Sequence, residues 1–191
     1  MKPNVLIGSM LAIIFPTILV VFAILFAYER AFETIAWLNL VLMLCFYSFM
    51  VHRYKLNYDL APKEYTLFYF LIAIAIGIGS GIVFADELSH ITVVTGTLII
   101  FVICSAIVEE LIFRNLMLGI FKKIFTFETA AFLQAFAFSV LHHRFTIVYL
   151  AGYFLFGLTM AYLLKNKKKG GLIYAIIAHV LANITELVWI M

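Results

Sequence analysis

Long runs of apolar residues, separated by short polar segments, follow one another along the whole chain. Most runs are close to the roughly 20 residues that a transmembrane helix needs, and they lack the in–out alternation of a barrel strand. Because lipid offers the backbone no hydrogen-bond partner, such runs predict helices. The expected fold class is all-α, a polytopic membrane helix bundle with about seven transmembrane helices. The predicted spans are residues 5–28, 35–51, 67–85, 91–121, 129–142, 146–164 and 172–190.

Two of the predicted spans have unusual lengths. Residues 5–28 follow Lys2 as the core of a signal peptide would, but the run is too long for one and no clear small-residue cleavage site follows it. It is therefore interpreted as the first span. Residues 129–142 are short for a complete crossing. The predicted organisation is an N-terminal region, residues 1–90, with about three spans, and a core region, residues 91–191.

Composition narrows the class of protein. Of 191 residues, 66% are hydrophobic and only 12% are charged, against about 45–50% and about 25% in a soluble globular domain. The polar residues needed to coat a soluble core are missing. This excludes a soluble enzyme, a disordered protein and a nucleic-acid-binding protein, so the lipid bilayer is an expected partner and nucleic acid is not. Cys45 and Cys104 lie in apolar runs and predict packing roles.

The basic residues predict the orientation of the chain, because lysine and arginine gather in cytoplasmic loops. With seven crossings, ten basic residues fall on one side and two, Arg30 and Arg144, fall on the other. The ten are Lys2, Arg53, Lys55, Lys63, Lys122, Lys123, Lys165, Lys167, Lys168 and Lys169. The N-terminus is therefore expected in the cytoplasm and the C-terminus outside. The expected location is a prokaryotic cell membrane, with the protein integral and multi-pass.

Three charged residues interrupt the fourth span, at Glu109, Glu110 and Arg114. An ionisable residue in the middle of a span costs about 2.5–3.5 kcal/mol on insertion scales, so each needs an explanation. On an α-helix, Glu110 and Arg114 are four residues apart and can form an ion pair that supports the structure. Glu109 points about 100° away and has no such partner in its own helix. Glu109 is therefore the leading candidate for a functional role.

Polar residues of two other spans are predicted at a similar depth. At about 1.5 Å per residue from the cytoplasmic ends, Glu109 and His142 lie roughly 20 Å deep and His179 roughly 15 Å deep. Asn183 follows His179 by four residues and shares its helix face. Histidine and asparagine in spans also serve as hydrogen bonds between helices, and that interpretation stays open for these residues. Gly77 and Gly81 have the small-xxx-small spacing that predicts close helix packing.

A carboxylate, two imidazoles and an amide in a membrane site favour activation of water. Glu109 is expected to take a proton from a water also held by His142, while His179 and Asn183 donate hydrogen bonds to the oxyanion that develops on an amide carbonyl. The sequence lacks the His-Glu-x-x-His metalloprotease motif, a pair of aspartates in the spans and a Gly-x-Ser-Gly setting. No cofactor is expected, but spacing alone leaves open a zinc site made of Glu109, His142 and His179.

Three short motifs occur in order within residues 91–191 and together resemble the CPBP family. This family comprises CAAX prenyl proteases and bacteriocin-processing or immunity proteins, also called Abi proteins. The motif residues are Glu109, Glu110, Arg114, Phe138, His142, His179 and Asn183. The resemblance implies an all-α catalytic membrane core in which Glu109 and His142 handle the water and His179 and Asn183 complete the site. It also implies supporting roles for Glu110, Arg114 and Phe138.

The predicted function is an intramembrane endopeptidase that acts on a prenylated CAAX protein or on a small peptide of the bacteriocin type. Two alternatives remain open at this level. One is a noncatalytic membrane immunity or scaffold protein that binds a bacteriocin or a peptide-receptor partner. The other is a small transporter with Glu109 and His179 as a proton relay. The sequence gives no prediction of the oligomeric state.

Overall fold

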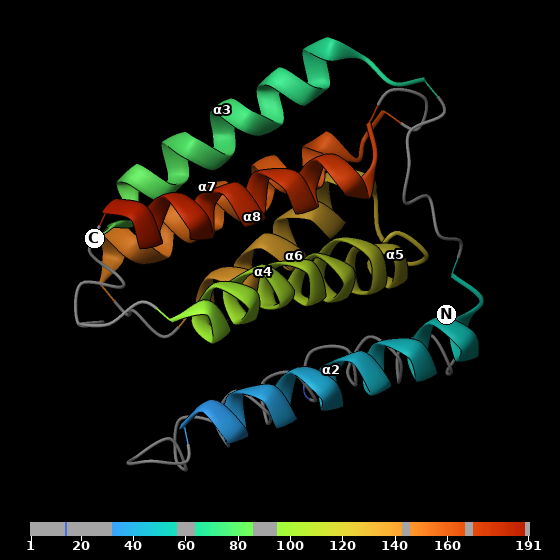
Figure 1. The fold of residues 1–191 in the computed structure, drawn as a ribbon. Coiled ribbons are helices and arrows are strands. Elements are labelled where there is room, and N and C mark those ends of the chain that lie inside the picture. Colours follow the sequence, from blue (N-terminus) through green and yellow to red (C-terminus); the bar gives the residue numbers. More distant parts are fainter. Residues whose placement is uncertain are drawn as a thin grey trace. The chain divides into compact units, whose positions relative to one another are not determined.

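The computed structural model describes Ile14 and residues 32–56, 64–85, 95–142, 146–166 and 170–189 (Figure 1). Regular secondary structure in these residues is entirely helical, as the apolar runs predict. The helices are α2 (Phe32–Tyr54), α3 (Leu67–Val83), α4 (Gly96–Glu110), η2 (Leu111–Met117), α5 (Leu118–Phe121), α6 (Phe127–Leu141), α7 (Ile147–Leu163) and α8 (Leu172–Trp189). The first predicted span, residues 5–28, lies outside the described residues except for Ile14. Each of the other six coincides with a helix or, for residues 91–121, with three successive helical segments.

Three of the described helices are long and apolar enough to cross a membrane. They comprise Ala36–Tyr54, Gly96–Phe121 and Leu172–Trp189. Three shorter apolar helices accompany them, namely Leu67–Val83, Phe127–Leu141 and Ile147–Leu163. A helical membrane bundle fits these lengths and compositions, while the number of seven crossings stays a prediction.

The chain divides into two compact units, each made of two separate stretches of sequence. Unit 1 comprises Met1–Tyr58 and Leu111–Tyr162, and unit 2 comprises Asp59–Glu110 and Leu163–Met191. Helices α2, η2, α5, α6 and α7 thus belong to unit 1, and α3, α4 and α8 to unit 2. The chain passes from unit 2 to unit 1 between Glu110 and Leu111, within the charged part of the fourth predicted span.

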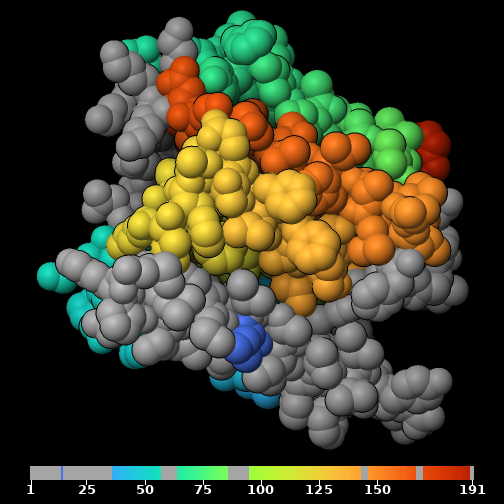
Figure 2. Space-filling model, turned by 180° about the vertical axis from the view of Figure 1, so that it is seen from behind, coloured from blue at the N-terminus to red at the C-terminus, as the bar shows by residue number. Residues whose placement is uncertain are grey.

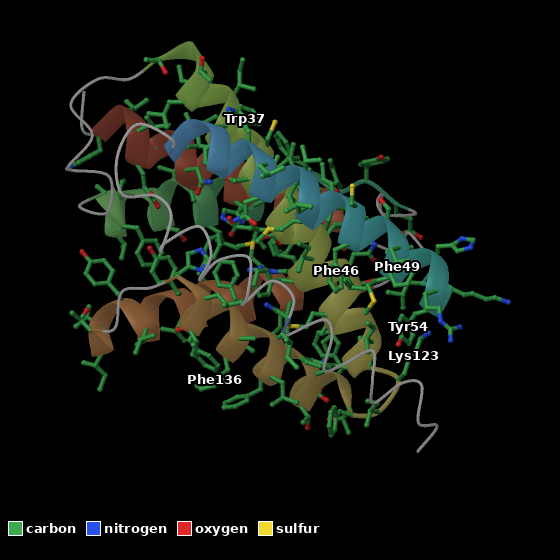
Figure 3. All side chains as sticks on the ribbon, turned by 90° about the horizontal axis from the view of Figure 1, so that it is seen from below. Trp37, Phe46, Phe49, Tyr54, Lys123 and Phe136 are labelled. Atoms are coloured by element: carbon green, nitrogen blue, oxygen red, sulfur yellow. The ribbon has the colours of Figure 1, made fainter. Side chains whose placement is uncertain are left out.

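In unit 1, polar contacts tie α2 to the segment that contains η2 and α5. The Asn115 side-chain amide donates to the Tyr47 hydroxyl at 2.6 Å. Near the end of α2, Lys123 Nζ donates to the carbonyl oxygen of Tyr54 at 2.8 Å (Figure 3). Both contacts join residues far apart in sequence, so they fix the register of α2 against this segment.

Helix α6 begins at a side-chain cap and packs on α7 in unit 1. The Thr126 hydroxyl accepts a hydrogen bond from the backbone N–H of Thr129, which satisfies one of the free donors at the helix start. Ser139 Oγ donates to the carbonyl oxygen of Leu150 on α7 at 2.6 Å. Parts of α6 and α7 lie at the surface in Figure 2. The exposed large hydrophobic residues of these helices include Phe132, Phe136 and Leu155, and Phe136 points away from its helix in Figure 3. Such residues suit contact with lipid.

In unit 2, α8 packs against both α3 and α4. Gly77 and Gly81 of α3 lie against the backbone of α8 at Ala178 and Ala182, which confirms the close packing predicted from their spacing (Figure 1). At the start of α3, the backbone N–H of Thr66 donates to the Tyr174 hydroxyl of α8 at 3.3 Å. Helix α8 is therefore held on one side by α3 while it presents polar residues to α4.

The segment η2 is a π-helix of seven residues that directly follows Glu110. In a π-helix the hydrogen bonds run from residue i to i+5, so each turn contains more residues than in an α-helix. Side chains on the two sides of η2 are therefore rotated about the axis relative to an unbroken α-helix. Such segments are rare and occur frequently at functional sites. This one separates the carboxylates of α4 from the basic end of the same predicted span at Lys122.

Candidate active site

His179 of α8 lies between two glutamates of α4 in unit 2. Its Nδ1 atom is 2.7 Å from Glu110 Oε1, a hydrogen-bond distance. Its Nε2 atom is 3.9 Å from Glu109 Oε2, beyond direct hydrogen bonding. The two carboxylates are consecutive in the last turn of α4, and the imidazole between them contacts one directly and faces the other.

The two glutamates differ in their access to the surroundings. The side chain of Glu110 is fully buried and that of His179 is 6% exposed, whereas the side chain of Glu109 is 27% exposed. Burying an ionisable group is costly unless it is paired and hydrogen-bonded, and the contact with His179 supplies such a partner for Glu110. Of the two glutamates, Glu109 is the one that a substrate or water can reach more readily.

Asn183, one turn after His179 on α8, also contacts α4. Its side-chain Nδ2 donates to the carbonyl oxygen of Val102 at 3.1 Å. Because an amide nitrogen carries two hydrogens, one donor of Asn183 holds α8 against α4 and a second remains for other use. Asn183 thus fixes the register that brings His179 level with Glu109 and Glu110.

His142 lies in unit 1, at the point where α6 ends. Its Nδ1 atom is 2.8 Å from the carbonyl oxygen of Phe138. A carbonyl oxygen can only accept, so Nδ1 carries the proton and Nε2 is the basic nitrogen when the ring is neutral. The ring stacks on Tyr153 of α7, with centroids 4.4 Å apart and planes at 30°. Helices α6 and α7 together therefore fix both the orientation of this imidazole and its tautomer.

Phe138 is at the centre of an aromatic cluster in unit 1. It is fully buried, and its ring centroid is 4.3 Å from the Arg114 guanidinium carbon and 5.1 Å from the centroid of Phe113. The same ring lies 4.1 Å from that of His142. Arg114, Phe138 and His142 therefore form one continuous stack. Cation–π and ring–ring contacts within this stack support the position of His142.

The sequence placed Glu110 with Arg114 on the basis of α-helical spacing. In the structure, Arg114 lies within the π-helix η2 and its guanidinium is over Phe138, so the spacing rule used for that pair does not apply to this segment. The pairing of Glu110 with Arg114 stays a prediction. The contact that sequence analysis missed is the one between Glu110 and His179. Glu109 and His179 were predicted at similar depths, and Glu110 is the neighbour of Glu109. The predicted depths could therefore have indicated the contact between Glu110 and His179.

Among the described residues, no group of three or more His, Cys, Asp and Glu side chains could hold a metal ion. Glu109 and His179 belong to unit 2 and His142 belongs to unit 1, and a zinc site made of these three residues stays an open alternative. The structure instead gives the imidazole of His179 a hydrogen-bonded carboxylate and the imidazole of His142 a hydrogen-bonded carbonyl.

Comparison with protein-family models matches residues 91–185 to the Rce1-like model, described as type II CAAX prenyl endopeptidase Rce1-like. The match contains all three motifs, from Glu109 to Asn183. The chain belongs to the Rce1-like CAAX prenyl endopeptidase family. No curated protein and no solved structure gives a match.

Membership of the Rce1-like family confirms the resemblance to CAAX proteases that the three motifs indicated. Together with the long apolar helices, it identifies the chain as an integral membrane protein of a CAAX-type protease family. Helices α2 and α3 precede the matched residues, yet α3 packs directly on the helix that carries His179. In this Rce1-like chain, a helix outside the matched region therefore contributes to the surroundings of the candidate site.

Proposed function

We propose that this protein is an intramembrane endopeptidase that hydrolyses a peptide bond in a prenylated, CAAX-type substrate with a water activated by Glu109. The observation that carries the proposal is the Glu109 side chain, which is 27% exposed and turns its buried Oε2 toward His179 Nε2, while the other nitrogen of His179 is bonded to the buried Glu110. The family match supports a CAAX-type peptide as the substrate class.

The space between Glu109 and His179 suits a water molecule. A water makes hydrogen bonds of about 2.8 Å, and two of these together exceed the 3.9 Å that separates Glu109 Oε2 from His179 Nε2. A water lying to one side of the line between the two atoms can therefore contact both.

In the proposed reaction, Glu109 takes a proton from this water and the hydroxide attacks the carbonyl carbon of the scissile amide. The electron pair of the C=O bond moves to oxygen, and Asn183 and His179 are proposed as donors to this oxyanion. When the C–N bond breaks, the leaving amine receives the proton that the water gave up. The products are a carboxylic acid and an amine, so one water is consumed and no covalent intermediate with the protein forms.

His142 joins the proposal on the basis of its motif, as a second group that handles the water. Its Nδ1 proton is committed to the Phe138 carbonyl, which makes its Nε2 an acceptor suited to a water proton when the ring is neutral. The test of this part is chemical: His142→Ala should lose cleavage while the protein still inserts and purifies normally.

The decisive experiment uses the full-length protein in liposomes with a farnesylated CAAX peptide that carries a fluorophore and a quencher. Wild type should release the three C-terminal residues, and Glu109→Gln should lower kcat by on the order of 10²–10⁴-fold because the general base is gone. Glu186 is another buried glutamate, on α8. The Glu186→Gln variant serves as the matched control and should cleave normally. Full activity of both Glu109→Gln and His142→Ala would overturn the mechanism.

The noncatalytic alternative gives a different result. A binding or scaffold protein should retain the farnesylated peptide without cleaving it, and Glu109→Gln should bind as well as wild type. Mass spectrometry of the recovered peptide separates the two functions, because hydrolysis shortens the peptide and binding does not. An unprenylated peptide of the same sequence, run in parallel, measures how far the lipid determines recognition.

A further inference from the structure

Glu110 and His179 form a short polar contact between α4 and α8. Its 2.7 Å length falls in the range of hydrogen bonds in which one partner is charged. Glu110 is fully buried, so bulk water does not compete for either atom. In such surroundings a hydrogen bond is stronger than in water.

Two further contacts hold the imidazole in this position. Asn183 Nδ2 bonds the Val102 carbonyl one turn along α8, which fixes the sliding register of α8 on α4. On its other side, α8 is in backbone contact with α3 at Gly77. These contacts set the position of α8, and the ring, which is only 6% exposed, directs Nδ1 at Glu110.

The proton on His179 follows from this geometry. An ionised carboxylate has lone pairs and no proton to give, so it accepts from Nδ1–H. In the neutral ring the other nitrogen, Nε2, is then unprotonated and faces Glu109. In that form Nε2 cannot donate to an oxyanion. It can do so only after it has gained a proton.

We propose that Glu110 is a positioning residue that keeps the proton of His179 on Nδ1 and so makes Nε2 the atom that receives and returns a proton beside Glu109. This inference rests on the proposed peptidase function and assigns Glu110 a role within it. It replaces a general supporting role for Glu110 with a defined effect on one atom of His179.

The proton balance of the reaction is then complete. The proton of the attacking water passes to Glu109 and, through the hydrogen bonds of the site, to His179 Nε2. The resulting imidazolium donates one hydrogen bond to Glu110 from Nδ1 and one to the oxyanion from Nε2. When the C–N bond breaks, Nε2 gives the proton to the leaving amine, and the neutral Nδ1–H ring is restored. No oxidant, reductant or further reactant is needed.

The first test reads the tautomer directly and does not require activity. The protein contains five histidines, so ¹⁵N-histidine labelling in detergent micelles gives few signals, and the pair lost in His179→Gln belongs to His179. Wild type at alkaline pH should show Nδ1 protonated and Nε2 unprotonated. Glu110→Leu should lose this preference. Glu110→Gln should keep it, because the amide oxygen still accepts, and Glu186→Gln should match wild type.

The second test is kinetic and uses the liposome assay. Glu110→Leu should lower kcat on the order of 10²–10⁴-fold with KM nearly unchanged, since Glu110 acts through His179 and does not contact substrate. Glu110→Gln keeps the shape and the acceptor but loses the charge, and should cost roughly tenfold in kcat. Because Glu110→Gln is almost isosteric, it remains informative if Glu110→Leu does not fold.

The two tests separate this inference from the function on which it rests. If wild type shows His179 protonated on Nε2, or if Glu110→Leu keeps the wild-type tautomer and kcat, the role of Glu110 is wrong even when Glu109→Gln is inactive. If the tautomer responds as expected but neither wild type nor Glu186→Gln cleaves any prenylated peptide, the inference about His179 stands and the peptidase function fails.

Discussion

Gly77 of α3 lies directly against the backbone of Ala178 in α8: a Cβ atom at position 77 would be 2.5 Å from the Ala178 carbonyl oxygen. Ala178 immediately precedes His179. The approach of α3 to α8 therefore sets how far α8 can move away from α4, and with it the separation of the imidazole from the two carboxylates. A single absent methyl group on one helix is thus linked to the geometry of a site on another.

This relationship predicts that Gly77→Ala and Gly81→Ala destabilise unit 2 by about 1–3 kcal/mol, because two backbones must separate to admit each methyl group. At position 81 a Cβ would lie 2.5 Å from the Ala182 carbonyl oxygen. Gly79→Ala is the matched control, since nothing lies within 4 Å of its added methyl group and alanine favours a helix. Thermal unfolding in detergent measures the effect, and equal stability of the Gly77 and Gly79 variants would contradict it.

The aromatic stack in unit 1 gives a second prediction. Phe138→Leu removes the ring from beneath Arg114 and from beside His142, and should lower the free energy of unfolding by about 1–3 kcal/mol. Phe136→Leu, two residues away on the same helix, should change it little because Phe136 is 56% exposed. Denaturation of the two variants side by side tests this, and an equal loss in both would show that the ring stack contributes nothing specific.

Metal dependence separates the glutamate mechanism from the zinc alternative. We expect prolonged dialysis against a strong zinc chelator to leave the rate of peptide cleavage unchanged, because Glu109 is proposed to take the water proton itself. The measurement is the liposome assay before and after dialysis, together with the zinc content of the purified protein. Loss of activity that returns with added zinc would favour a site made of Glu109, His142 and His179.

The distribution of basic residues predicts the orientation of the chain. A reporter enzyme that is active only outside the cytoplasm should be active when fused after Met191 and inactive when fused before Met1. Replacing the four lysines within residues 165–169 with neutral residues should weaken this preference, since they form the largest basic group. Activity of both fusions, or of the N-terminal fusion alone, would contradict the predicted seven crossings.

The helices were largely predictable because the membrane imposes a simple rule on the sequence. Residues 67–85 were expected as a span, and α3 occupies Leu67–Val83; residues 172–190 were expected, and α8 occupies Leu172–Trp189. Polar residues end these runs, and lipid cannot hydrogen-bond a broken backbone, so the ends of the apolar runs and of the helices nearly coincide. What this rule cannot give is the number of residues per turn, because both α- and π-helices satisfy their own backbone.

The candidate site was predicted in part for a similar reason. Counting the rise per residue brought Glu109 and His179 to comparable depths, and the structure places their side chains 3.9 Å apart. The direct partner of His179 is Glu110, which sequence reasoning paired with Arg114 because that residue is nearest along an ideal helix face. Sequence spacing indicates local partners, whereas a contact between helices such as that of Glu110 with His179 depends on the packing of α8 on α4. The pairing of Glu110 with Arg114 stays a prediction.

The π-helix η2 has a consequence for comparing and recombining proteins of this type. An α-helical relative would need one residue fewer between Glu110 and Leu118 to keep both ends in the same rotational phase. A chimera joined across this segment with the wrong count would carry every motif residue and still change the rotational phase of Leu118 relative to Glu110 along the helix. Correct function in such hybrids therefore depends on a residue number as well as on residue identities.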